Sequence, residues 1–245
     1  MRLLISLTSD NHVNESSFDK YSFQSAIYYI LRDQGMNDYH DAKGFKFFSF
    51  SDFFPSGDLP KGGKKSIMFS SPDQEIVLNV KKGLERSKTL YLKDSVLNVT
   101  HMELYAISSK HNTFISGSPV VLYKDNDKNL YFSFGKGGNF EFFMNRIKEN
   151  AEKKYRQFTG MDSFSLSEPI FDSFQLRKEV AVRLSKSGKD FIMIGTVWKI
   201  LKKERISHEK LDFYRFIADT GIGEKNSLGF GFLNPLEENY DAKRS

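Results

Sequence analysis

The order in which strand and helix patterns follow one another is the feature that most restricts the fold of this 245-residue chain. The chain begins with a short apolar segment. An amphipathic segment with a 3.6-residue period comes next, on which Phe23, Ile27, Ile30 and Leu31 share one face. Alternating aromatic segments and a second helical pattern complete the first half. The predicted strands lie at residues 1–8, 44–54, 65–71 and 89–107, the last of these segments forming one strand or two, and the predicted helices lie at residues 21–33 and 72–86.

The second half of the chain repeats this arrangement, with a hairpin in the place of the first strand. It contains the same alternation of strand and helix patterns, and Ser207 is the expected N-cap of its second helix. The predicted hairpins lie at residues 118–136 and 173–203, the predicted helices at 139–158 and 207–221, and the last strand at 228–235.

The order strand, helix, strand, strand, helix, strand defines the ferredoxin-like unit, whose topology the RNA-recognition motif shares. The sequence therefore predicts an α+β protein with two tandem ferredoxin-like domains, residues 1–112 and 113–245, with their junction near residues 108–118. Because this topology supports enzymes, regulators and RNA-binding proteins alike, the fold by itself does not assign a function.

Composition narrows the class of partner. The chain has 36 basic and 31 acidic residues, a net charge of +5, together with 24 phenylalanines and 11 tyrosines. This balance favours an anionic partner such as single-stranded RNA, whose bases stack on aromatic rings. The lack of cysteine excludes disulfides, zinc–thiolate sites and a cysteine nucleophile. No apolar run reaches membrane-spanning length, so we expect a soluble, cytoplasmic protein with no membrane partner.

The stretch GIGEKNSLGFGF, residues 221–232, holds four glycines around a polar centre. Successive backbone N–H groups in such a loop can bind an anion, and the central Lys225, Asn226 and Ser227 favour contact with phosphate. The alternative is a helix C-cap followed by a strand that needs small residues for packing, and the spacing alone favours this alternative. The spacing matches neither the P-loop nor the dinucleotide-binding fingerprint.

Two motifs carry a resemblance to a known family. GIGEKNSLGFGF resembles the C-terminal glycine-rich signature of the repeat-associated RNA-processing proteins of CRISPR systems. YHDAKGFKFFSFS, residues 39–51, resembles a segment of the sixth Cas family, the CRISPR-associated endoribonucleases that cut precursor CRISPR RNA. In that family the segment carries a histidine, a glycine, a lysine and an aromatic strand. The resemblance covers essentially the whole chain in element order.

The resemblance implies that His40, Lys46 and Tyr28 are catalytic. Cleavage of RNA without a metal needs a group that titrates near neutrality, a cation for the phosphorane and a further donor. His40 lies where the family's catalytic histidine falls, and Lys46, on the predicted strand, would stabilise the phosphorane. Lys43, closer to His40, is the competing lysine. Without the resemblance, the three residues are explained as a solvated loop histidine, an edge-strand lysine and a packing tyrosine.

Helical periodicity separates the two neighbouring tyrosines. Tyr28 lies about 100° from Ile27, the centre of the buried face, whereas Tyr29 lies about 200° away and is expected to face solvent. Tyr28 is therefore the better candidate to present a hydroxyl to the site, as a donor or orienting group.

The implied function is a metal-independent endoribonuclease that cuts CRISPR repeat RNA by 2′-hydroxyl attack, with no metal and no cofactor. The alternative is a non-catalytic CRISPR RNA-binding subunit on the same scaffold. The implied partners are the precursor and mature guide RNA and a CRISPR interference complex, and the choice between monomer and homodimer stays open. The residues expected to contact RNA are Gly221, Gly223, Lys225, Asn226, Ser227, Gly229, Gly231 and Lys43.

Overall fold

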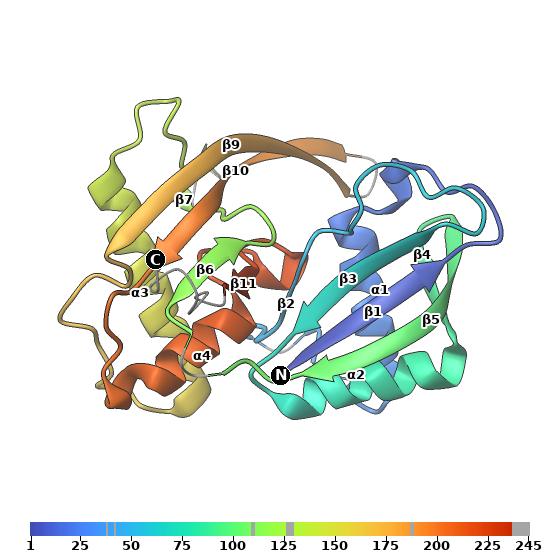
Figure 1. Cartoon of the computed structure of the whole chain (residues 1–245), viewed down its shortest axis with the longest axis horizontal. Coiled ribbons are helices and arrows are strands. Elements are labelled where there is room, and N and C mark those ends of the chain that lie inside the picture. The colour runs from blue at the N-terminus through green and yellow to red at the C-terminus, as the bar shows by residue number, and fades with distance from the viewer. Residues whose placement is uncertain (38, 42, 109–110, 126–129, 187–188, 237–245) are drawn as a thin grey trace, which may run out of the picture.

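The computed structural model describes residues 1–37, 39–41, 43–108, 111–125, 130–186 and 189–236. Two halves, each a sheet with its helices, lie side by side (Figure 1). The long hairpin of β9 (Ser173–Lys186) and β10 (Lys189–Lys202) arches from the C-terminal half towards the N-terminal half. No helix in the described part of the chain combines the length and the apolar character needed to cross a membrane.

The N-terminal sheet has five strands in the order β2-β3-β1-β5-β4, and every pair is antiparallel. The central strand β1 buries Leu3, Ile5 and Leu7 on one face, and both helices of this half pack there. The elements are β1 (Arg2–Thr8), β2 (Ser49–Phe50), β3 (Lys64–Ser70), β4 (Thr89–Leu92), β5 (Ser95–Tyr105), α1 (Lys20–Asp33), α2 (Gln74–Ser87) and the 3₁₀ turn η1 (Glu15–Ser17).

The C-terminal sheet has the order β11-β6-β10-β9, and β7 and β8 pair apart from it. Trp198 and Leu201 of β10 are buried in one core with Phe143 of α3 and Phe213 of α4. The remaining elements are β6 (Thr113–Ser116), β7 (Tyr123–Asp125), β8 (Leu130–Tyr131), β11 (Leu233–Pro235), α3 (Phe140–Thr159), α4 (Leu211–Thr220), η2 (His208–Lys210) and η3 (Asn226–Leu228).

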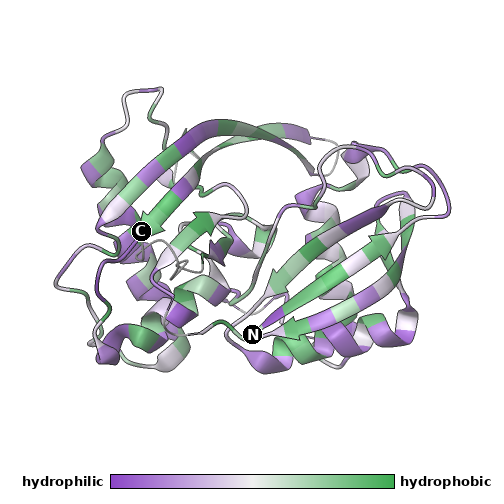
Figure 2. Cartoon of the chain, viewed as in Figure 1, coloured by the Kyte–Doolittle hydropathy of each residue, from purple (hydrophilic) through white to green (hydrophobic). Residues whose placement is uncertain are grey.

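Both sheets contain the ferredoxin-like strand order, in which the first strand lies between the fourth and the third. In the N-terminal sheet this order is β5-β1-β3-β2, and β4 is an additional edge strand. In the C-terminal sheet it is β11-β6-β10-β9. The predicted α+β fold of two tandem ferredoxin-like units is therefore confirmed. The strand β9 of the arching hairpin is banded with hydrophilic and hydrophobic residues, as a largely exposed strand requires (Figure 2).

The structure corrects three strand assignments. The first strand of the C-terminal unit is β6, which falls inside the segment expected to be a junction, and the hairpin predicted in its place is the separate β7–β8 pair. The strand predicted at 44–54 is only Ser49–Phe50, because the aromatic alternation before it serves packing on the other half. The ring of Phe47 lies 5.1 Å from that of Phe158 and 6.2 Å from that of Phe216.

The strand predicted at residues 228–235 is only β11 (Leu233–Pro235). Gly229 and Gly231 have φ angles of +76° and +69°, which break the extended conformation. Residues 221–231, the glycine loop, instead turn back on themselves. Ile222 N donates to Gly231 O at 3.0 Å, and Glu224 N donates to Val121 O at 2.8 Å.

A buried ion pair joins the two halves. Arg2 of β1 lies 3.6 Å from the carboxylate of Asp219 in α4, and it donates to the carbonyls of Ala218 and Leu233 at 2.7 and 2.6 Å. Ser70 of β3 donates to the same carboxylate at 3.0 Å. Burial lowers the pKa of Arg2 to about 10, and Asp219 partly opposes that shift. These hydrogen bonds hold the ends of β1 and β3 against α4.

The glycines of the glycine loop are required by close contacts as well as by backbone angle. A Cβ on Gly221 would lie 2.7 Å from Gly231 O, and a Cβ on Gly223 would lie 2.6 Å from Val121 O. A Cβ on Gly231 would overlap Ile222 O, and one on Gly229 would overlap the Phe50 ring of β2. The loop is thus packed tightly within the C-terminal half and against the N-terminal half.

We expect Gly231→Ala to destabilise the protein far more than Gly137→Ala. Both glycines have positive φ, but a Cβ on Gly137 would meet no atom within 4 Å, whereas a Cβ on Gly231 would meet Ile222 O. Gly137→Ala should cost about 1 kcal/mol for the backbone angle alone, and Gly231→Ala about 3 kcal/mol or more. Urea unfolding monitored by circular dichroism measures both. If both variants lose the same free energy of unfolding, the overlap with Ile222 O does not affect stability.

Candidate functional site

One stripe of α1 holds the glycine loop against the N-terminal half. Lys20, Gln24 and Tyr28 follow one another at i, i+4 spacing and therefore share a face of the helix. Lys20 Nζ donates to Gly229 O at 2.7 Å, and Gln24 Nε2 donates to Ser227 O at 2.9 Å. Tyr28, one turn further along, lies against the same loop at Ser227. Lys20 and Gln24 were not among the predicted site residues, although their four-residue spacing from Tyr28 is visible in the sequence.

Tyr28 meets His40 at the C-terminal end of this stripe. The two rings are 4.7 Å apart, edge to face at 86°. His40 is 65% exposed, and its Nδ1 lies 2.6 Å from the Asp41 carboxylate. When Nδ1 carries the proton of that hydrogen bond, Nε2 is left as the ring nitrogen that can exchange a proton with a substrate. The site is therefore open to solvent on the histidine side.

Tyr28 and Tyr29 occupy the positions that periodicity predicted. Tyr28 is half-buried, whereas Tyr29 is 60% exposed and has Arg32 against its ring at 5.4 Å. Burial raises the pKa of Tyr28, and the hydrogen bond with Ser227 partly opposes that shift. The phenol consequently keeps its proton at neutral pH and is equipped to donate it in a hydrogen bond.

Lys46 comes close to the same cluster from the segment that precedes β2, and not from a strand as predicted. Its Nζ donates to Tyr39 O at 2.6 Å and lies 5.4 Å from the Tyr39 ring, which is itself 6.5 Å from the Tyr28 ring. Burial lowers the pKa of Lys46, and Asp41 partly opposes this. The structure thus gathers a lysine, a histidine and a tyrosine around Tyr39. Lys43 is exposed on the same segment.

The interior of the glycine loop is organised by Lys154 of α3, which is 3% exposed. Its Nζ donates to Gly221 O at 2.8 Å, to Gly223 O at 3.3 Å and to Asn226 Oδ1 at 2.6 Å. The Asn226 amide in turn donates to Ile222 O and Phe230 O, at 3.0 and 2.9 Å. Burial lowers the pKa of Lys154 to about 7, and the charge of Glu224 partly opposes this.

Lys154 was not among the predicted site residues. Its position follows the buried Ile147 by seven residues and the buried Ala151 by three. Helical periodicity therefore places it on the inner face of α3, and this register was the available signal. A lysine on that face needs carbonyl partners, which the glycine loop supplies.

The residues predicted to contact RNA from the glycine loop differ in exposure. Lys225 is exposed, with its Nζ 5.5 Å from the Tyr123 ring, and Ser227 is half-buried against α1. Gly221, Gly223, Asn226, Gly229 and Gly231 are buried. Contact between this loop and a ligand is therefore open mainly to Lys225.

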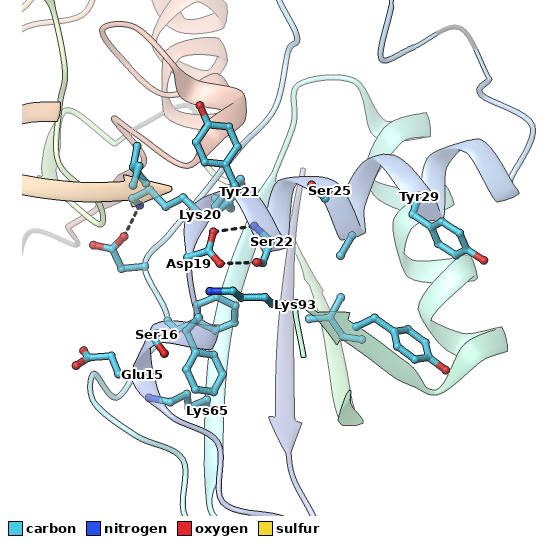
Figure 3. A pocket seen from close by; sticks show the side chains of 18 of the residues that line it. Glu15, Ser16, Asp19, Lys20, Tyr21, Ser22, Ser25, Tyr29, Lys65 and Lys93 are labelled. Atoms are coloured by element: carbon cyan, nitrogen blue, oxygen red, sulfur yellow. Dashed lines mark hydrogen bonds and ion pairs between the residues drawn. The ribbon is translucent and has the colours of Figure 1, made fainter. Parts of the chain in front are cut away.

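A groove of about 1320 Å³ runs along another side of α1, and Tyr28, His40 and Lys46 lie outside it (Figure 3). Ser22, Ser25 and Tyr29 line it from α1, and residues 182–185 line it from the arching hairpin. Six of its charged side chains pair with one another. The pairs are Lys20 with Asp52, Arg86 with Asp33 and Arg183 with Asp190. Among the described residues, no group of three or more histidines and carboxylates is arranged to hold a metal ion.

The fold and the site together define a class of protein. The protein has two tandem ferredoxin-like units and a cluster of histidine, tyrosine and lysine, open to solvent on the histidine side, beside a buried glycine loop. The family model "CRISPR associated protein Cas6, C-terminal" matches residues 100–235. The chain is 38% identical over 243 residues to CRISPR-associated endoribonuclease Cas6 2 of Methanocaldococcus jannaschii, a match that covers 97% of this chain and 100% of the relative. The chain belongs to the CRISPR-associated endoribonuclease family Cas6.

More distant relatives agree with this assignment. CRISPR-associated endoribonuclease Cas6 1 of the same organism is 25% identical over 255 residues, which cover 97% of this chain and 94% of the relative. A solved structure of a CRISPR associated protein Cas6 matches with a TM-score of 0.72 at 25% identity, over 97% of this chain and 99% of that one. A solved RAMP protein binding different RNA substrates has the same TM-score at 19% identity, over 97% and 100% of the two chains, and shares the fold.

We expect the free energy of unfolding to rise between pH 7 and pH 9 because of Lys154. A lysine with a folded pKa of about 7 binds fewer protons than an unfolded lysine across this range, so the folded state gains stability as the pH rises. The free energy of unfolding of the wild type, relative to Lys154→Met, should increase by about 2 kcal/mol from pH 7 to pH 9. Urea unfolding at both pH values measures it. A difference that does not change with pH would show that Lys154 titrates as an ordinary lysine.

Proposed function

We propose that this Cas6 endoribonuclease cuts CRISPR repeat RNA in precursor transcripts by attack of the RNA's own 2′-hydroxyl, without a metal ion, and so releases guide RNAs. The observation that carries the proposal is the edge-to-face contact of His40 with Tyr28 beside Lys46. The names of the relatives, which describe CRISPR-associated endoribonucleases, supply the substrate class.

Each side chain has a role in this reaction. The 2′-oxygen attacks the adjacent phosphorus, and the bond from phosphorus to the 5′-oxygen breaks, which leaves a 2′,3′-cyclic phosphate and a 5′-hydroxyl. His40 serves as the general base that takes the 2′-proton or as the acid that gives a proton to the 5′-oxygen. Lys46 opposes the extra negative charge of the phosphorane, and Tyr28 donates a hydrogen bond to it. A cyclic phosphate that is later hydrolysed becomes a 3′-phosphate.

The RNA would reach this site across the exposed basic side chains that flank it. Lys43, on the segment before β2, and Lys225, on the glycine loop, are the two exposed lysines of the predicted RNA-contact set. Contacts from lysine to phosphate release counterions, so binding should weaken as salt concentration rises. The mature guide RNA would then pass to a CRISPR interference complex.

The test is cleavage of the host's own repeat RNA in EDTA by the wild type and by His40→Ala. We expect His40→Ala to cut about 10²-fold more slowly or worse, at unchanged RNA affinity, because it lacks the proton-transfer group. His101→Ala is the matched control, since His101 is also exposed and paired with a nearby carboxylate, Glu103. It should cut at the wild-type rate.

A substrate with a 2′-deoxy nucleotide at the cut should bind and stay intact, because the internal nucleophile is missing. Cleavage by His40→Ala at the wild-type rate would refute the assignment of His40. Tight binding by the wild type with no cleavage would instead identify a non-catalytic RNA-binding subunit.

A further inference from the structure

We propose that Phe45 and Lys153 hold one nucleotide of the RNA next to the cut, with its base stacked on the Phe45 ring and its phosphate beside the Lys153 ammonium group. The inference rests on the proposed function and names the part of the substrate that each half of the protein contacts. Phe45 precedes Lys46 in the chain, and Lys153 lies on α3 of the C-terminal half. Three observations support it.

The first observation is that the Phe45 ring packs in none of the hydrophobic clusters of the described residues, unlike the rings around it. Tyr39 and Phe48 pack in the core of the N-terminal half, and Phe47 packs on the core of the C-terminal half. Phe45 is half-buried, and its ring lies 6.5 Å from that of Phe47. A large ring left partly open to solvent between two cores is suited to a ligand with a flat face, such as a nucleobase.

The second observation is the cation beside that ring. Lys153 is exposed, and its Nζ lies 5.9 Å from the centre of the Phe45 ring. On the same helix, Lys148 and Arg156 each lie 3.9 Å from the carboxylate of Glu152. No carboxylate among the described residues forms an ion pair with Lys153. Its charge is therefore available to a phosphate that adjoins a base on the ring.

The third observation is the closeness of this pair to the catalytic cluster. Lys46 follows Phe45 directly, and its Nζ donates to Tyr39 O at 2.6 Å, which brings the two ends of residues 39–46 together. His40 and Phe45 are five positions apart, so their Cα atoms lie at most about 18 Å from one another. A base on the Phe45 ring therefore belongs to a nucleotide close to the bond that is broken.

Helix α3 holds the Phe45 ring in place. A Cβ on Gly44 would overlap the side-chain amide of Gln157 on α3, so the backbone before Phe45 lies directly on that helix. On the other side of Phe45, the Phe47 ring lies 5.1 Å from that of Phe158, also on α3. A ring fixed on both sides loses little conformational freedom when a base stacks on it.

The test is a double-mutant cycle between the protein and the RNA. The probe is the host's own repeat RNA with a 2′-deoxy nucleotide at the cut, which binds and stays intact. A set of abasic forms lacks one base of the repeat at a time. Fluorescence anisotropy measures the affinity of each RNA for the wild type and for Phe45→Leu, which keeps an apolar side chain without a flat ring.

We expect Phe45→Leu to bind the complete RNA about tenfold more weakly, because the stack with one base is lost. One abasic form, whose missing base adjoins the cut, should bind equally well to the wild type and to Phe45→Leu. Phe45→Trp, which keeps a flat ring, should restore most of the affinity for the complete RNA.

Lys153→Met tests the phosphate contact. It removes the charge and keeps most of the apolar chain. The variant should bind every RNA of the set more weakly, and the slope of log affinity against log salt concentration should be smaller by about 0.7. An unchanged slope would show that Lys153 does not pair with a phosphate.

Tyr29→Leu and Lys82→Met are the matched controls. Tyr29 is 60% exposed and has Arg32 against its ring at 5.4 Å, the same arrangement of ring and cation on another helix. Lys82 is an exposed lysine of α2. Both variants should bind all the RNAs like the wild type. Thermal unfolding followed by circular dichroism should show that every variant is folded at the temperature of the assay.

The outcomes separate this inference from the proposed function. If Phe45→Leu binds the complete RNA and every abasic form with the same loss, or with none, Phe45 does not stack on a base and the inference is wrong. The cleavage assigned to His40 is unaffected by that result. Coupling of Phe45 to a base far from the cut would also overturn the inference. Coupling to a base at the cut supports it, even if His40→Ala cuts at the wild-type rate and the catalytic assignment fails.

Discussion

The buried Lys154 side chain at the centre of the glycine loop is the interaction on which the site depends. It has three hydrogen-bond partners, two of them backbone carbonyls of the glycine loop. The loop in turn needs glycine where a Cβ would overlap a carbonyl or the Phe50 ring. Lysine, glycines and asparagine are therefore a single unit, and a change to one of them leaves polar groups of the others without partners.

Helix α1 connects the glycine loop to the site. Its Lys20, Gln24 and Tyr28 contact the glycine loop in succession, while its Phe23 and Ile27 are buried against the N-terminal sheet. One helix thus belongs to the core of one half and to the boundary with the other. This is why a site formed largely by N-terminal residues depends on a loop close to the C-terminus. The buried pair of Arg2 and Asp219 holds the same two halves at a second point.

Much of the fold could be predicted from the sequence, because hydrophobic periodicity reflects which face of each helix and strand is buried. The same reasoning separated Tyr28 from Tyr29. It failed where aromatic residues alternate for another reason. Phe47 packs on α3 and α4 and not in a sheet, so Lys46 lies in a segment outside the strands. It also failed for β6, a four-residue strand whose pairing with β10 and β11 is non-local.

The resemblance to a known family marked His40, Lys46 and Tyr28 as candidates, and the sequence by itself determined much of the element order and the positions that must be glycine or amphipathic. These are local properties, set by backbone angles, side-chain period and residue chemistry. Only the tertiary structure decided that Tyr28 meets both His40 and Ser227, and that Lys154 fills the glycine loop. Those contacts join residues up to about 200 positions apart in the chain. Their energies come from burial and from hydrogen-bond partners that local sequence does not specify.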